Sequence, residues 1–246
     1  MYKNELPSPF FNIHHSPNQP TQHSSNMSDA ENKHSMAHHT PAPPQVANPG
    51  PLGLSAFSLT TFVLSCYNAG AGVSPTGPAT IIVGLALFYG GLVQLLAGMW
   101  EFKAGNMFGA TAFSSYGAFW LSFGVIFIPW FGILAPYTTK DAAGNDFTYE
   151  LDNALGIYLL AWTIFTGIML IASHRTSGGL VALFFALFVT FVLLTASKFN
   201  ASTTCQVAGG AFGIITAIIG WYVALSGLLT PETSNFTLPV LPLKKN

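Results

Sequence analysis

Charged residues are scarce in this 246-residue chain: 8 Lys and Arg and 9 Asp and Glu make up 7% of it, whereas 50% of the residues are hydrophobic. A water-soluble domain of this length needs a far more charged surface, so the composition excludes most soluble enzymes. The formal net charge of −1 gives no electrostatic reason to expect a nucleic-acid partner. The shortage of charge predicts a protein whose solvent is the lipid bilayer, with transport as the leading class of function.

Residues and motifs that support catalysis or metal binding are also missing from the apolar part of the chain. Its membrane-length apolar stretches contain no His. The chain has no Walker-type glycine loop and no Gly-x-Ser-x-Gly motif, and Cys66 and Cys205 give no disulfide pattern. Six of the seven His lie in the first 47 residues, with an irregular spacing that does not indicate a metal site. We therefore predict no catalytic residues, no metal and no cofactor, and expect that the protein is not an enzyme.

What the chain does contain is six apolar stretches, at residues 53–73, 79–100, 107–134, 154–173, 179–197 and 206–229. About 20 apolar residues cross the hydrocarbon core as a helix, and these stretches lack the alternation of a transmembrane strand. The predicted fold class is an all-α membrane protein with six transmembrane helices per protomer. Residues 48–230 would form the transport domain, between a disordered cytoplasmic tail at residues 1–47 and a short cytoplasmic tail at residues 231–246.

Positively charged residues predict the orientation. If the stretches alternate across the membrane, six of the eight Lys and Arg lie on one side, and only Lys140 and Lys198 lie on the other. The positive-inside rule then places both termini in the cytoplasm. In this orientation Asn200, within the sequon Asn200-Ala-Ser202, faces outside and is a candidate for glycosylation.

Neutral polar side chains are distributed along the apolar stretches. Thr61 and Asn68 share one face of the first stretch with Phe57, and Gln94 lies in the second. A primary amide is costly in lipid, so Asn68 and Gln94 would either hydrogen-bond between helices or line a pore. The candidate lining is completed by two hydroxyl residues of the third stretch, Thr111 and Ser115. Neutral donors can solvate a small anion or its neutral acid without trapping it, which favours a small-solute channel or carrier.

Carboxylates are absent from the middle of the stretches, and the nearest one belongs to Glu101, in the sequence Glu101-Phe-Lys103 at the end of the second stretch. Glu101 could pair with Lys103, gate a cytoplasmic mouth together with it, or reach water from the interface. Proton pumps and many coupled carriers keep ionisable residues within the membrane, so the sequence leaves the mode of coupling open.

The segment Asn48-Pro49-Gly50-Pro51-Leu52-Gly53-Leu54 resembles the signature Asn-Pro-Ala-Pro-Leu-Gly-Leu of the acetate uptake transporter family, with Gly50 in place of the usual Ala. That family includes bacterial succinate–acetate permeases and fungal acetate and ammonia-export proteins. The likeness extends over about residues 47–240 and includes Phe88-Tyr-Gly-Gly91, Glu101-Phe-Lys103 and Thr111-Ala-Phe-Ser-Ser-Tyr-Gly-Ala-Phe-Trp120.

This resemblance implies a homo-hexamer in the plasma membrane, in which each protomer has its own path for acetate, with protons as a partner ion. It also implies a hydrophobic constriction formed by Phe57, Tyr116 and Leu187. The favoured function is therefore transport of acetate and other short monocarboxylates, either with a proton or as the anion through a channel. Two alternatives stay open: an ammonium or ammonia exporter, and a membrane sensor or organiser that transports nothing.

Overall fold

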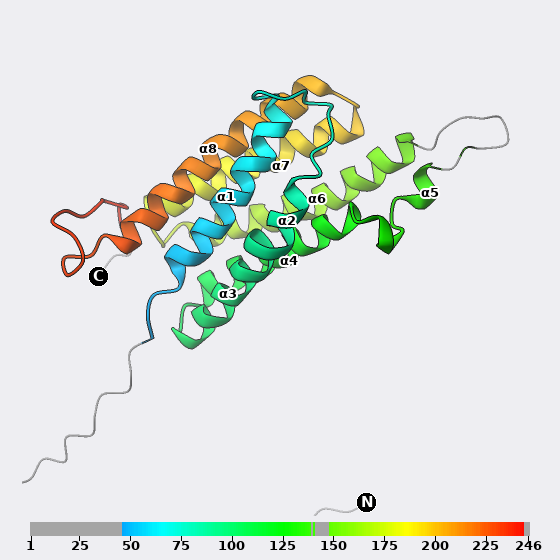
Figure 1. Cartoon of the computed structure of the whole chain (residues 1–246). Helices are drawn as coiled ribbons and strands as arrows, with labels where there is room; N and C mark the ends of the chain where they lie inside the picture. Colours follow the sequence, from blue (N-terminus) through cyan, green and yellow to red (C-terminus); the bar gives the residue numbers. More distant parts are fainter. Residues whose placement is uncertain (1–45, 139, 141–147, 244–246) are drawn as a thin grey trace, which may run out of the picture. The chain divides into compact units, whose positions relative to one another are not determined.

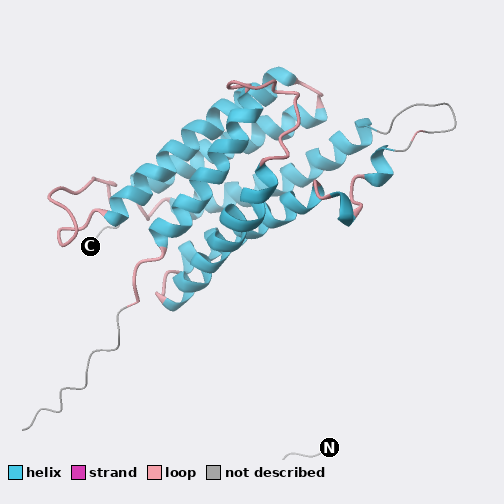
Figure 2. Ribbon diagram, viewed as in Figure 1, coloured by secondary structure: helices cyan, strands magenta, loops and turns pink. Residues whose placement is uncertain are grey.

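The computed structural model describes residues 46–138, 140 and 148–243, so most of the predicted N-terminal tail lies outside the described residues. The described part is helical (Figures 1 and 2), and an isolated β-bridge joins Ser177 to Pro242. Its long helices are α1 (Gly50–Ala69), α4 (Met107–Ile126), α6 (Thr148–Ser173), α7 (Gly178–Phe199) and α8 (Thr203–Leu228). A further long helix joins α2 (Ile82–Leu87), the π-helical turn η1 (Phe88–Val93) and α3 (Gln94–Lys103). The short elements η2 (Pro129–Phe131) and α5 (Ala135–Thr138) follow α4.

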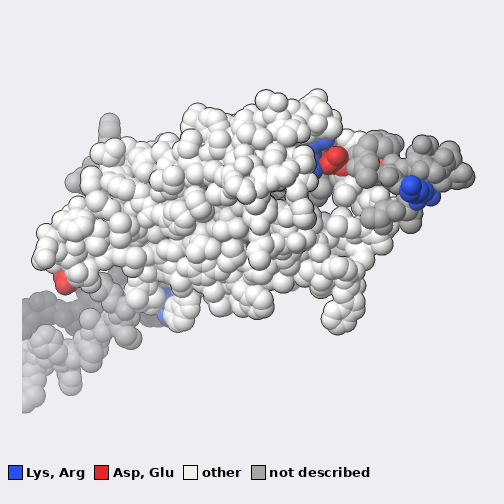
Figure 3. All heavy atoms as spheres, turned by 45° about the horizontal axis from the view of Figure 1, so that its top comes forward, with Lys and Arg blue, Asp and Glu red and all other residues white. Residues whose placement is uncertain are grey.

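Five helical spans among the described residues are long and apolar enough to cross a membrane: Gly50–Ala69, Ile82–Lys103, Glu150–Ser173, Gly178–Phe199 and Thr203–Leu228. On the face drawn in Figure 3, charged side chains lie only at the two ends of the helical bundle. The predicted all-α, multi-pass membrane fold is therefore confirmed. Helix α4 has the same length as α1 but is not among the five, so its role as a sixth span stays a prediction.

Several predicted boundaries were wrong, for local reasons. Helix α1 ends at Ala69 instead of residue 73, because Gly70 adopts a left-handed φ of 71° and closes the helix. Helix α4 ends at Ile126 instead of residue 134. Pro129 pushes the residue before it, Ile128, into an extended conformation, and the chain then turns through η2. Helix α6 begins at Thr148, six residues before the predicted start of that span.

The helices close a ring in the order α1, α8, α7, α6, α4 and α3, with α3 returning to α1. The seam between α4 and α6 has the fewest backbone contacts, and aromatic side chains fill it. Phe119 of α4 packs edge-on against Trp162 of α6, with ring centroids 5.2 Å apart, and Tyr116 packs edge-on against Phe165 at 5.5 Å. The interior of this ring is where a solute could pass.

Glycine allows the closest approach in the ring, between α8 and α1. A Cβ atom added to Gly210 would collide with the backbone nitrogen of Ala69 and would lie 2.7 Å from the carbonyl oxygen of Ser65. Only a residue without a side chain lets the two backbones meet there. The contact therefore fixes α8 against the end of α1 that carries Asn68.

The start of α1 and the end of α8 lie at the same end of the bundle, since a Cβ on Gly227 would be 2.9 Å from the ring of Pro51. Beyond α8 the chain returns to the start of α7, where Gly178 N–H donates to the carbonyl of Leu241 at 2.8 Å. The chain therefore enters α1 and leaves α8 at the same end of the bundle. An even number of membrane crossings would produce this arrangement.

Candidate functional site

Two cavities lie end to end inside the ring of helices. The large cavity, about 300 Å³, lies where α1 and α7 end and where α6 and α8 begin. The small cavity, about 110 Å³, lies towards the opposite end, near Gly50, Asn106 and Leu180. Among the residues that line them, only Phe57, Tyr116 and Leu187 belong to both. These three side chains are therefore the layer that separates the two cavities.

The separating layer is tightly packed, and its three residues are at most 5% exposed. The rings of Phe57 and Tyr116 lie 6.0 Å apart at an angle of 58°. The hydroxyl groups of Tyr116 and Thr166 share a hydrogen bond of 2.8 Å, which ties the tyrosine ring to α6. Sequence reasoning named these three residues only through family resemblance. The structure brings them together from α1, α4 and α7.

Two buried donors in the lining of the large cavity have no hydrogen-bond partner among the described residues, Thr61 Oγ1 and Trp120 Nε1. Buried polar atoms are normally paired, so an unpaired one needs an explanation. The neighbouring Thr60 shows the ordinary case, because its hydroxyl donates to the carbonyl of Ala56 at 2.9 Å. Sequence reasoning missed Trp120. Its spacing of four residues from Tyr116 on α4 was the available signal, since it puts both on one helix face.

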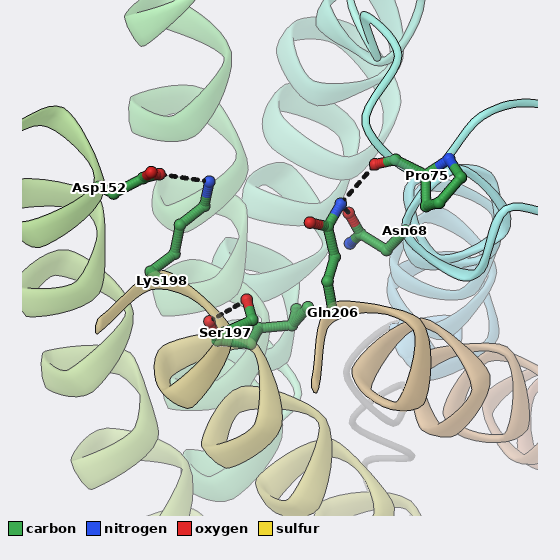
Figure 4. A network of polar contacts seen from close by, with 7 residues as sticks. Asn68, Pro75, Asp152, Ser197, Lys198 and Gln206 are labelled. Atoms are coloured by element: carbon green, nitrogen blue, oxygen red, sulfur yellow. Dashed lines mark hydrogen bonds and ion pairs between the residues drawn. The ribbon is translucent and has the colours of Figure 1, made fainter. Parts of the chain in front are cut away.

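Polar residues line the far end of the large cavity (Figure 4). Gln206 of α8 donates to the carbonyl of Pro75 at 2.6 Å, and its amide lies 3.5 Å from Asn68 Oδ1. Asn68 thus lines the cavity and also contacts a residue of another helix. Lys198 and Asp152 form an ion pair of 2.8 Å beside them. Sequence reasoning missed Gln206 and Asp152 as site residues and used Lys198 only for orientation.

Gln94 lies on the lining of the small cavity, and it is 1% exposed. Its Oε1 atom has no hydrogen-bond partner among the described residues. Gln94 follows directly after the π-helical turn η1, whose wider turn changes which face of the helix continues into the bundle. The apolar periodicity of the sequence gives no sign of this turn.

Glu101 is 2% exposed and accepts a hydrogen bond from Asn106 Nδ2 at 2.8 Å, whereas Lys103 is exposed. Asn106 Oδ1 in turn accepts from Gly109 N–H at 3.1 Å, which caps α4. The Glu101 carboxylate is thus buried against the start of α4 beside the small cavity, and it does not reach water as one alternative supposed. Neither Glu101 nor Lys103 lines a cavity described here.

The segment Asn48–Leu54 forms the start of α1 and ties it to its neighbours. Asn48 Oδ1 accepts from Gly50 N–H at 2.9 Å. A Cβ on Gly53 would lie 2.7 Å from the ring of Phe113, so glycine is needed for α1 to approach α4. Gly50 and Leu54 line the small cavity. The remaining residues of the segment are Pro49 at the N-cap, Pro51, which is buried, and Leu52, which is exposed.

Thr111 and Ser115 are not among the residues that line these two cavities, so their role in a polar lining stays a prediction. The hydroxyl of Thr111 donates to the carbonyl of Met107 at 2.9 Å, the bond within one helix that threonine commonly makes. Asn200, the glycosylation candidate, is exposed at the end of α7, and its amide donates to the carbonyl of Ala196 at 2.9 Å.

Comparison with known proteins agrees with this architecture. A family model described as the GPR1/FUN34/yaaH family matches residues 31–245. The chain belongs to this family. The resemblance noted in the sequence is thereby confirmed, because relatives of the chain carry the names of acetate permeases and ammonia-export proteins.

Among these GPR1/FUN34/yaaH relatives, Ammonia transport outward protein 2 of Saccharomyces cerevisiae is 47% identical over 84% of this chain and 70% of its own length. Acetate permease A of Emericella nidulans is 45% identical over 79% of this chain and 65% of its own. Succinate-acetate/proton symporter SatP of Escherichia coli is 34% identical over 80% of this chain and 96% of its own. The solved structure of the bacterial acetate channel SatP matches with a TM-score of 0.65 at 33% identity, over 79% of this chain and 98% of that one.

Proposed function

We propose that this protein transports acetate and other short monocarboxylates across the plasma membrane. The observation that carries the proposal is the pair of cavities inside the helix ring, which only Phe57, Tyr116 and Leu187 separate. A single apolar layer between two cavities allows a small solute to pass when side chains move, and it opposes larger or strongly hydrated solutes. Relatives named acetate permease, succinate-acetate/proton symporter and acetate channel support the choice of substrate.

The polar atoms beside this layer suit a carboxylate. Thr61 and Trp120 offer donors without partners on the side of the large cavity, and Asn68 adds an amide further out. A carboxylate accepts hydrogen bonds and could replace its lost hydration with these groups. Gln94 would receive the solute on the other side of the layer. Glu101 and Lys103 line neither cavity, but Glu101 accepts a hydrogen bond from Asn106 of the small cavity, and through this bond it would act with Lys103 at the cytoplasmic mouth.

Two modes of transport fit this path: co-transport with a proton, and passage of the anion through a channel. The names of the relatives include a proton symporter and a channel. From the family resemblance we also propose that six protomers assemble, each with its own path. Both modes are transport rather than catalysis, and neither needs a metal or a cofactor.

Export of ammonium or ammonia is the second candidate, since a relative 47% identical to the chain is named for outward ammonia transport. Asp152 at the end of the large cavity could attract a cation. Against this candidate, the unpartnered groups next to the layer on that side are a hydroxyl and an indole N–H, and an indole N–H cannot accept a bond from ammonium.

The test is uptake of labelled acetate into proteoliposomes that contain the purified full chain, with empty vesicles as the reference. Uptake that an inward proton gradient stimulates beyond the passive leak of acetic acid would establish proton-linked transport. Uptake that follows the membrane potential would establish an anion channel. Absence of uptake above empty vesicles would reject acetate transport, and labelled methylammonium in the same vesicles would then distinguish an exporter from a sensor.

One pair of variants connects this flux with the proposed lining. Thr61→Val keeps the shape of the side chain but removes its hydroxyl, and we expect acetate uptake to fall about ten-fold, because a hydrogen bond to a charged group contributes roughly 1.5–3 kcal/mol. Ser58→Ala is the matched control, since Ser58 Oγ is also buried without a partner on α1 but lines neither cavity. Equal uptake by the two variants would remove Thr61 from the path.

A further inference from the structure

The strongest charged feature of the path is the ion pair between Lys198, in the last turn of α7, and Asp152, in the second turn of α6. Lys198 is the only Lys or Arg among the described residues that line either cavity. The side chains of Lys198 and Asp152 are 33% and 38% exposed, so the pair lies where the large cavity meets solvent. Figure 4 shows the pair together with Gln206 and Asn68, which line the same cavity.

We propose that Lys198 is an anion-capture site at the mouth of the large cavity, in which the Asp152 carboxylate occupies the place of the substrate carboxylate. This inference rests on the proposed transport of monocarboxylates and names the residue that first binds them. The chemistry is the same for both carboxylates: each accepts a charge-assisted hydrogen bond from the Lys198 ammonium. Lysine has three N–H donors, and one of them is used in the 2.8 Å bond to Asp152 Oδ1.

Exposure of the pair makes exchange between the two carboxylates feasible. Ion pairs that solvent reaches contribute little to stability, because water screens the attraction and both side chains lose freedom. An incoming carboxylate can therefore replace Asp152 at Lys198 without disrupting a buried network. Lysine suits this role better than arginine would, because its ammonium is a compact point charge without a two-pronged geometry that holds one carboxylate.

Asp152 then weakens the binding of the substrate anion to Lys198. While it is paired, it lowers the positive charge available to a second anion, and it competes with that anion for the same donor. The arrangement keeps capture weak, as transport requires, since a solute must leave the site as readily as it enters. Asn68 and Gln206 lie next along the same cavity and would receive the carboxylate after Lys198.

The proposal predicts opposite effects for two variants that both break the ion pair. Lys198→Gln removes the cation, and we expect the half-saturation concentration for acetate to rise about five-fold, the effect of one unit charge about 4 Å away in water. Asp152→Asn frees the cation, and we expect the half-saturation concentration to fall about two- to five-fold. Lys198→Arg keeps the charge and should therefore not show the roughly five-fold rise of Lys198→Gln. Arg175→Gln, which removes an exposed charge outside both cavities, should leave it unchanged.

The measurement is equilibrium exchange of labelled acetate in proteoliposomes, with equal acetate and equal salt on both sides, so that the orientation of the protein does not matter. Each protein is measured at about 10 mM and about 200 mM salt, because an exposed charge acts over roughly 30 Å at the lower concentration and under 10 Å at the higher. Salt should raise the half-saturation concentration of the wild type and of Lys198→Arg. It should not raise that of Lys198→Gln, in which only the Asp152 carboxylate remains at the mouth.

A purely structural ion pair would give a different pattern. In that case Lys198→Gln and Asp152→Asn would shift the half-saturation concentration in the same direction, or would change only the maximal rate and the melting temperature. Either result would overturn the capture site while leaving acetate transport intact. A wild-type protein without exchange above empty vesicles would instead reject the proposed function, and the capture site with it.

Discussion

At the scale of single residues, five buried polar atoms among the described residues lack a hydrogen-bond partner: Ser58 Oγ, Thr61 Oγ1, Gln94 Oε1, Ser114 Oγ and Trp120 Nε1. Three of them belong to residues that line a cavity, whereas Ser58 and Ser114 pack against other helices at Gly220 and Gly98. An unpartnered buried polar atom can therefore either face a cavity or pack against a neighbouring helix. Its position relative to the cavities distinguishes the two cases. Sequence reasoning proposed Thr61 and Gln94 as polar lining residues, but it had no means of separating Trp120 from the other aromatic residues.

Leu187 gives a test of the separating layer at this scale. In Leu187→Ala the layer loses part of its apolar side chain, so we expect the uptake of butyrate relative to acetate to rise several-fold. The control is Leu183→Ala, one turn earlier on α7, because Leu183 is equally buried but lines only the small cavity. Each change removes a buried leucine side chain and should lower stability by a similar amount, about 2–5 kcal/mol in soluble proteins.

The ratio of the two uptake rates in proteoliposomes measures selection by size independently of the amount of folded protein. A rise in this ratio for Leu187→Ala alone would support the layer. An equal ratio in both variants would mean that solute size is selected elsewhere along the path.

At the scale of elements, glycines determine how closely the helices of the ring approach. Glycines recur at helical spacing in the sequence, as at Gly84, Gly91 and Gly98, and this spacing favours close helix packing. It does not show which glycine meets which helix. Gly210 meets the backbone of α1 at Ala69, whereas a Cβ on Gly84 of α2 would have nothing within 4 Å. The difference arises because only some positions of a small-residue face point at a neighbouring backbone.

This difference predicts opposite effects for two identical substitutions. In Gly210→Ala the new methyl group collides with backbone atoms that cannot rotate away, and we expect a loss of about 1–3 kcal/mol or more in stability. In Gly84→Ala the methyl group meets open space and favours the helix, so the stability should be unchanged or up to about 1 kcal/mol higher. Thermal unfolding of the purified proteins in detergent checks both values. Equal melting temperatures would contradict the close contact between α8 and α1.

At the scale of the whole molecule, the large cavity lies at the end of the bundle opposite the start of α1 and the end of α8. If both termini are cytoplasmic, the Lys198–Asp152 pair faces outside and the signature segment Asn48–Leu54 faces the cytoplasm. The loops at the two ends should then react with an impermeant reagent from opposite sides of the membrane.

We therefore predict that an impermeant maleimide labels Thr204→Cys in intact cells, whereas it labels Asn235→Cys only after permeabilisation. Both positions are exposed: Thr204 lies in the first turn of α8, and Asn235 lies beyond the end of α8. The native Cys66 and Cys205 are replaced by Ala in both proteins, so that each carries a single thiol. The reverse pattern would invert the proposed orientation. Labelling of both introduced cysteines in intact cells would contradict the placement of the two positions at opposite ends of the bundle.

The sequence by itself determined the solvent, the helical class and the kind of function. Hydropathy and charge are sums over neighbouring residues, so a shortage of charge over long stretches is sufficient to predict helices in lipid. The motifs at Asn48–Leu54 and Thr111–Trp120 added the family. Hydropathy did not predict where the helices end. Gly70 and Pro129 end helices through local backbone geometry, and an average of hydropathy over many residues does not contain that information.

Only the tertiary structure decided which polar residues face a path. The separating layer joins residues up to 130 positions apart, from Phe57 to Leu187, and the ion pair joins Asp152 to Lys198 across two helices. Thr111 and Thr61 look alike in sequence, yet one hydroxyl bonds its own helix and the other lies without a partner beside a cavity. The rotation of each helix about its axis makes this difference, and that rotation is set by packing against neighbours that are distant in the chain.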